Sequence, residues 1–131
     1  MMMPAGRYYI GDLCYVMDDA DWSDICEKTF RDGKIIDGEF ILADGRVIAT
    51  YRTKWGDGEY YSNIGTVHCV DSGSIGCILE SDINIELDDS NLSYVGVMMD
   101  FEKPFVTSSH EGIIQFGFIE IDTDPVFDED Y

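Results

Sequence analysis

Asp-Gly pairs divide the first half of this chain into short segments. They occur at 32–33, 37–38, 44–45 and 57–58, and Asp-Gly is a dipeptide that fits the tight turn of a β-hairpin. The segments between and after these pairs are rich in β-branched and aromatic residues, and turn signals recur about every 8–12 residues. This pattern is typical of a small antiparallel barrel or sandwich.

Three segments are predicted to form hairpins. They are residues 39–52 around Asp44-Gly45, residues 51–63 around Asp57-Gly58, and residues 66–80 with a turn at 71–74. Residues 92–106 and 112–124 are predicted as further strands, joined by the polar segment 107–112.

One segment, residues 18–31, has the periodicity of a helix. Asp18 suits the N-cap, acidic residues follow in the first turns, and Gly33 suits the left-handed residue that ends a helix. Apolar and small residues share one face: Trp22, Ile25, Cys26, Thr29 and Phe30. The predicted fold is therefore mainly β, a compact antiparallel barrel or sandwich with one α-helix at about 18–31.

We expect a single β-rich domain over residues 1–124, followed by an acidic, mobile C-terminal tail at 125–131. A chain of 131 residues buries about two-thirds of the surface of its unfolded state, so folding requires neither a metal nor a disulfide. The residues expected to be largely buried are Trp22, Ile25, Phe30, Phe40, Leu42, Val47, Ile78, Ile83, Ile85, Leu87, Ile119 and Ile121.

The charge of the chain is concentrated in its second half. Residues 1–54 hold 10 acids and 7 bases, a net charge of −3, whereas residues 55–131 hold 17 acids and one base, Lys103, a net charge of −16. A total of −19 disfavours direct binding to nucleic acid and to anionic membranes. It favours cationic partners, either metal ions or basic protein surfaces.

The expected location is intracellular. The N-terminal residues lack the basic start and apolar core of a secretory signal, and no run approaches the length of a membrane span. The four cysteines are then expected to be reduced thiols.

Enzymatic and metal-binding chemistries have weak support in the sequence. His68 and Cys69 are adjacent on a predicted strand and point to opposite faces, although His68 could meet Cys14 or Cys77 across strands. The cysteines lack the paired spacing of zinc ligands, and the acids of 18–29 lack the glycine of a calcium loop. We expect no catalytic residues and no cofactor, while weak Ca²⁺ or Mg²⁺ binding by the acidic strands stays open.

Two segments combine strand alternation with rows of carboxylates. In residues 80–88 the acids alternate with Ile83, Ile85 and Leu87, and the pattern returns in residues 118–124. Such alternation predicts half-buried strands with one acidic face each. The residues expected to bind a basic partner are Glu80, Asp82, Glu86, Asp88, Glu120, Asp122 and Asp124.

Three motifs resemble a small family of large DNA viruses and bacteriophages. They are YYIGDLCYV at 8–16, WGDGEYY at 55–61 and VDSGSIGCI at 70–78. The family usually has Pro where this chain has Leu13, and the resemblance extends over about residues 7–79. It implies a viral origin and assigns no catalytic or binding residue.

The function expected from these observations is a non-catalytic, acidic viral protein. It would present its carboxylates to a basic host protein that binds nucleic acid, as a nucleic-acid mimic or an inhibitor of host defence, in the host cytoplasm. One alternative is a structural or assembly component of the virion. Another is a small enzyme or a protein that binds divalent metals.

Overall fold

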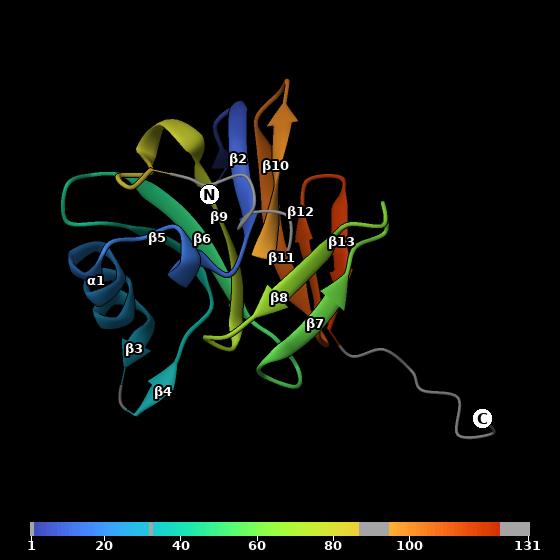
Figure 1. Ribbon diagram of the computed structural model, residues 1–131, viewed down its shortest axis with the longest axis horizontal. Coiled ribbons are helices and arrows are strands. Elements are labelled where there is room, and N and C mark those ends of the chain that lie inside the picture. The colour runs from blue at the N-terminus through green and yellow to red at the C-terminus, as the bar shows by residue number, and fades with distance from the viewer. Residues whose placement is uncertain (1, 32, 87–94, 124–131) are drawn as a thin grey trace.

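Two antiparallel sheets packed face to face form most of the molecule (Figure 1). The structure is a computed structural model that describes residues 2–31, 33–86 and 95–123. The fold is mainly β, as the sequence predicts, and its arrangement is that of a sandwich. The predicted tail at 125–131 lies outside the described residues.

The larger sheet has five strands, in the order β10 (Gly96–Phe101), β2 (Gly6–Gly11), β9 (Ser74–Leu79), β6 (Val47–Arg52) and β5 (Gly38–Ile41). The second sheet has four, in the order β1 (Met2–Met3), β11 (Phe105–His110), β12 (Ile113–Phe116) and β13 (Ile119–Asp122). Two short pairs complete the strands: β3 (Phe30–Arg31) with β4 (Lys34–Ile35), and β7 (Gly58–Tyr61) with β8 (Val67–Val70). Two 3₁₀ turns, η1 (Leu13–Tyr15) and η2 (Glu80–Asp82), follow β2 and β9.

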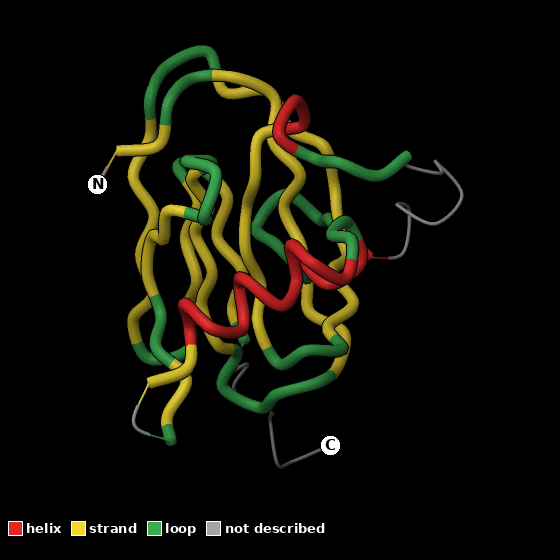
Figure 2. Tube along the Cα trace, turned by 90° about the vertical axis from the view of Figure 1, so that its left-hand side faces the viewer, coloured by secondary structure: helices red, strands yellow, loops and turns green. Residues whose placement is uncertain are grey.

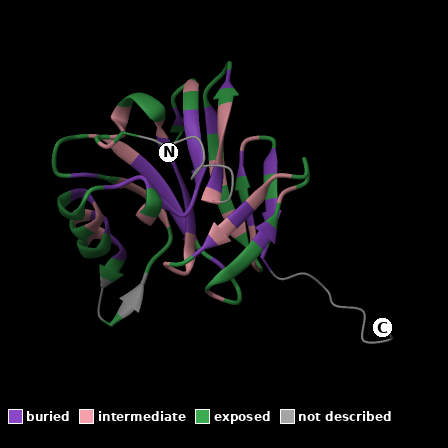
Figure 3. Cartoon of the chain, in the orientation of Figure 1, coloured by how far each residue is buried: buried purple, intermediate pink, exposed green. Residues whose placement is uncertain are grey.

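The five-stranded sheet is buried on both faces. One face, which includes Tyr8, Ile10 and Cys77, packs against the four-stranded sheet. The other face, which includes Tyr9, Ile48 and Ile78, packs against η1 and the helix α1 (Asp19–Thr29). Figure 2 shows α1 crossing the strands on this side, and Figure 3 shows the buried residues gathered along the central strands.

Three glycines lie side by side on β10, β2 and β9. Gly11 pairs with Gly96 on one side and with Gly76 on the other. A Cβ atom at Gly11 or Gly96 would lie within 3 Å of the Tyr9 ring, and one at Gly76 would lie 2.9 Å from Leu13. The missing side chains therefore leave the room in which Tyr9 and Leu13 pack on the sheet.

The helix begins as predicted and ends early. The Asp18 side chain accepts a hydrogen bond of 2.8 Å from the backbone of Asp21, so Asp18 is the N-cap. The helix ends at Thr29 instead of residue 31, because Phe30 is extended and begins β3. The prediction that Phe30 is buried is wrong, since its side chain is 57% exposed.

Of the three predicted hairpins, one is confirmed. β5 and β6 pair through the turn at Asp44-Gly45. The hairpin predicted for 51–63 is wrong, because β6 pairs with β9 while β7 pairs with β8. The ladder predicted between the strands of 66–80 is also wrong, because β9 pairs with β2 and β6. β6 and β9 are buried on both faces, so they pair with each other inside the large sheet and not with β7 or β8, which lie between them in the sequence.

The acidic strand predicted for residues 80–88 does not form over its described part. β9 ends at Leu79, and the chain turns through η2. Arg46 holds this turn against the helix: its guanidinium donates to the backbone oxygen of Asp82 at 2.9 Å and makes two bonds to the Asp21 carboxylate. Asn84 also donates to Asp21, at 3.0 Å.

The predicted core is partly confirmed. Five of the expected residues are buried: Ile25, Leu42, Ile78, Ile119 and Ile121. Five are half-buried: Trp22, Phe40, Val47, Ile83 and Ile85. Leu87 lies outside the described residues.

Asp12 joins two of the sequence motifs inside the molecule. Its carboxylate is fully buried and accepts hydrogen bonds of 2.6–3.0 Å from the backbones of Cys14, Asp71 and Ser72 and from the Ser72 hydroxyl. The bonds connect the end of β2 to the turn between β8 and β9. Because each carboxylate oxygen accepts two of them, the group is fully satisfied without a positively charged partner.

We predict that Asp12→Asn lowers the free energy of unfolding by about 2–4 kcal/mol, because an amide nitrogen in place of one oxygen leaves two buried donors without an acceptor. Urea denaturation measures the change. Asp71→Asn, which alters an exposed side chain in the same turn, is the matched control and should have little effect. Equal stability of the two variants would contradict this role for Asp12.

Candidate functional site

Among the acids predicted to bind a partner, those that the structure describes do not form one surface. Glu80 lies at the start of η2 and pairs with Arg7 at 3.0 Å, and the backbone of Asp82 is held by Arg46. Glu86 is exposed beyond this turn. Glu120 and Asp122 lie on β13, which is on the other side of the molecule from η2 in Figure 1. Asp88 and Asp124 lie outside the described residues.

The alternation predicted for β13 is confirmed. Ile119 and Ile121 are buried, whereas Glu120 and Asp122 are exposed. The buried pair packs in the core between the two sheets, so the acids point away from it. Of the two predicted acidic strands, this is the one that the structure forms.

The strand β7 extends the acidic surface of β13. Ser62, just after β7, forms an antiparallel bridge with Ile121, and the backbone of Asn63 donates to Glu120 at 2.8 Å. Side chains along paired strands alternate between the face toward the core and the face toward solvent. The exposed residues of β7 and β13 therefore lie on the same, outer face. We call this surface the outer acidic face. It comprises Glu59, Tyr61, Gln115, Glu120 and Asp122.

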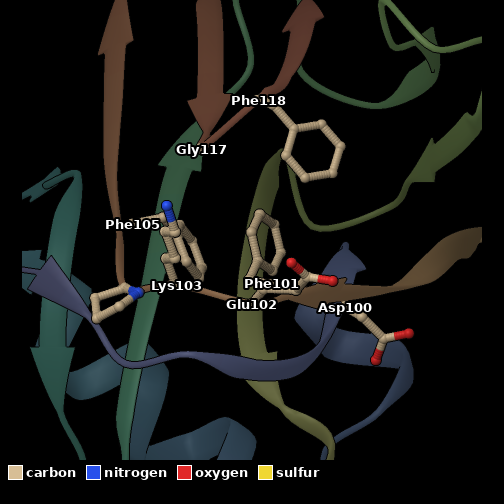
Figure 4. Close-up of a pocket in the computed structure, with 8 residues that line it drawn as sticks. Asp100, Phe101, Glu102, Lys103, Phe105, Gly117 and Phe118 are labelled. Atoms are coloured by element: carbon tan, nitrogen blue, oxygen red, sulfur yellow. The ribbon is translucent and has the colours of Figure 1, made fainter.

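A pocket of about 420 Å³ opens where two turns meet at one end of this sheet. The end of β10, the following turn and the start of β11 contribute Asp100 to Phe105, and the turn between β12 and β13 contributes Gly117 and Phe118 (Figure 4). We call it the aromatic pocket, because three phenylalanine rings line it.

The three rings have a defined arrangement. Phe101 and Phe105 are buried and stacked, with ring centres 3.9 Å apart and planes 19° apart. Phe118 is 53% exposed and lies 5.4 Å from Phe101 at a tilt of 44°. Stacking fixes the first two rings as a floor, and Phe118 forms a wall that solvent reaches.

Gly117 permits the close approach of the two turns. Its φ of +60° is in the left-handed region, and a Cβ atom there would lie 2.9 Å from the Phe101 ring. A larger residue would push the turn, and Phe118 with it, away from Phe101.

Charged groups surround the opening of the pocket. Asp100 pairs with Arg7 at 3.0 Å, and Glu102 and Lys103 are exposed. In Figure 4 the carboxylates of Asp100 and Glu102 lie on the side of Phe101, and Lys103 extends along Phe105. The pocket therefore combines aromatic faces with a carboxylate on one side of its rim.

The pocket does not follow from the strand pattern of the sequence, although a signal was present. That pattern predicts residues 92–106 as a strand, whereas β10 and β11 are separate strands joined at Glu102-Lys103-Pro104. Proline lacks the N–H that continues a strand ladder. It thus marks a turn that brings Phe101 and Phe105 together. The segment 107–112 was predicted as a loop, but most of it belongs to β11.

His68 does not pair with a thiol. It is fully buried, and its ring nitrogens lie 2.8 Å from the Thr66 hydroxyl and 3.2 Å from the backbone oxygen of Ile10. Burial raises the pKa of Cys14 and of Cys77 above the ordinary range of a thiol. Both thiols are therefore protonated and poorly nucleophilic at neutral pH.

Within residues 2–31, 33–86 and 95–123, no group of three or more His, Cys, Asp or Glu side chains is placed to hold a metal ion. The described helices include none long and apolar enough to cross a membrane.

No family model, curated protein or solved structure matches the chain. The resemblance of the three motifs to a viral family therefore stays a prediction. The outer acidic face and the aromatic pocket are therefore the features from which a function is inferred.

Burial lowers the pKa of His68 to about 4 from its usual 6.5. As the pH falls below 6.5, the unfolded state binds a proton that the folded state does not, so this residue's contribution to stability is lost between pH 6.5 and 4. We predict that the difference in unfolding free energy between the wild type and His68→Gln shrinks by about 3 kcal/mol from pH 7 to pH 4. Urea denaturation at several pH values measures it. A difference independent of pH would contradict a neutral, buried His68.

Proposed function

We propose that this chain is a non-catalytic binding protein whose acidic surface engages a basic protein. The net charge of −19 supports this role, since such a charge repels nucleic acid and attracts basic surfaces. The motifs that resemble a viral family make a host protein that binds nucleic acid the expected partner.

The outer acidic face is the observation that carries the proposal. Glu59, Glu120 and Asp122 are exposed on adjoining strands. Alternate side chains on one strand lie about 6.6–6.8 Å apart, so this face concentrates negative charge. A cationic partner would be attracted to it.

Three arginines with described side chains pair with acids elsewhere. Arg46 pairs with Asp21 and Asp44, and Arg52 pairs with Asp37. Arg7 pairs with Glu80 and Asp100. Of these pairs, Arg46 with Asp21 is largely buried and links the β5–β6 turn to the helix.

Mimicry of a nucleic acid is supported by one acidic strand, β13, whereas the sequence pattern predicts two. The predicted acidic row at 80–88 is replaced over its described part by η2 and an irregular segment. A partner that normally binds duplex DNA would therefore meet β13 and β7 instead of two long acidic strands. Competition by duplex DNA for the captured partner tests this point directly.

Removing the charge of the outer acidic face should abolish partner binding. The variant Glu59→Gln/Glu120→Gln/Asp122→Asn keeps the shape of the side chains and removes three charges. Its matched control, Glu80→Gln/Asp82→Asn/Glu86→Gln, removes three charges from the η2 region. We expect the control to retain most of its binding, because electrostatic attraction falls off within about 10 Å at 0.1 M salt.

The experiment captures basic proteins from host lysate at low salt with the wild type and then compares the two variants on the captured protein. Surface plasmon resonance over a salt series gives the affinities, and we expect wild-type binding to weaken as salt rises. If both variants lost the same affinity, binding would depend on the net charge of the protein and not on the outer acidic face. Full binding by the first variant would overturn the proposed face.

A further inference from the structure

We propose that the aromatic pocket binds an arginine side chain of the basic partner. This inference rests on the proposed function and adds to it one specific contact. The pocket adjoins the outer acidic face, so one partner can occupy both.

Asn63 connects the two surfaces. Its side-chain nitrogen donates to the backbone oxygen of Phe118 at 3.0 Å, and its side-chain oxygen accepts from the backbone of Glu120 at 2.9 Å. Phe118 forms the wall of the pocket, and Glu120 belongs to the outer acidic face. A basic segment lying along β13 would therefore reach the pocket at the β12–β13 turn.

The geometry of the rings suits a guanidinium group. Phe101 and Phe118 are tilted by 44° with their centres 5.4 Å apart, and Phe118 is the ring that solvent reaches. A guanidinium is planar and weakly hydrated, and it stacks on aromatic faces, which attract cations. The volume of about 420 Å³ lies at the small end of the range for ligand sites, about 300–1,000 Å³, and is enough for one long side chain.

The rim supplies an acceptor for the cation. The Glu102 carboxylate is exposed beside Phe101 (Figure 4). A carboxylate can receive two parallel hydrogen bonds from one guanidinium. Asp100, on the same side, adds negative charge, although Arg7 already pairs with it.

Lys103 is the one positive group among the residues that line the pocket. It repels a bound cation, so it lowers the affinity for arginine and raises the affinity for an anion. Its removal therefore has opposite consequences for the two kinds of ligand.

The pocket is set before a ligand binds. Gly117 holds the turn close to Phe101, and the stacked pair of Phe101 and Phe105 is part of the core. A preformed wall and floor reduce the ordering that binding requires.

The test uses two small probes that differ in charge and not in shape. N-acetyl-arginine-N-methylamide carries the guanidinium, and the citrulline analogue replaces it with a neutral urea. Titration of ¹⁵N-labelled protein should shift the amide signals of Gly117 and Phe118, with an affinity for the arginine probe at least about three-fold higher than for citrulline.

Four variants give the expected pattern. Phe118→Leu keeps an apolar side chain without an aromatic face and should weaken arginine binding by about two- to five-fold. Glu102→Gln should weaken it as well, and Lys103→Gln should strengthen it. Ile41→Ala, which alters an exposed apolar residue on β5, is the control and should leave it unchanged.

Equal binding of the arginine and citrulline probes would overturn the inference, and so would weaker arginine binding by Lys103→Gln. The proposed function is judged separately. If the pocket variants bind the protein partner as tightly as the wild type while the outer-face variant does not, the pocket inference fails and the proposed function stands.

Discussion

Burial of the five-stranded sheet on both faces is the constraint on which the rest of the structure depends. Its central strands are buried at four consecutive positions each, so both faces of the sheet are covered. The four-stranded sheet covers one face, and α1 with η1 covers the other. The order of the strands, the position of the helix and the outward direction of the acids on β13 all follow from this requirement.

Two polar groups hold the connections around this sheet. Asp12 binds the turn between β8 and β9 to the end of β2, accepting from three backbone N–H groups and from the Ser72 hydroxyl. Arg46 binds η2 to the helix through Asp21, and the pairing lowers the pKa of that carboxyl. Buried polar groups of this kind contribute most when every donor and acceptor is satisfied, and no buried side-chain polar atom of the described residues lacks a partner.

The paired arginines and the outer acidic face belong to different parts of the molecule. Arg7, Arg46 and Arg52 lie in ion pairs that brace the large sheet and its flanking segments. Acids with exposed side chains gather on β13 and β7, beside a pocket with aromatic walls. In the proposed function, such a surface would act through two effects: long-range attraction that speeds encounter with a basic ligand, and short-range stacking that selects one side chain.

The sequence by itself determined the elements whose signals are local. The cap at Asp18, the hairpin at Asp44-Gly45 and the alternation of β13 depend on neighbouring residues, and all are present in the structure. The alternation at 80–86 is equally regular, yet the chain forms η2 there, and Arg46 from a distant turn donates to the backbone oxygen of Asp82. The aromatic pocket likewise joins two turns that are far apart in the chain. Contacts between remote segments decided these features, because they depend on the packing of the whole fold and local sequence patterns do not encode them.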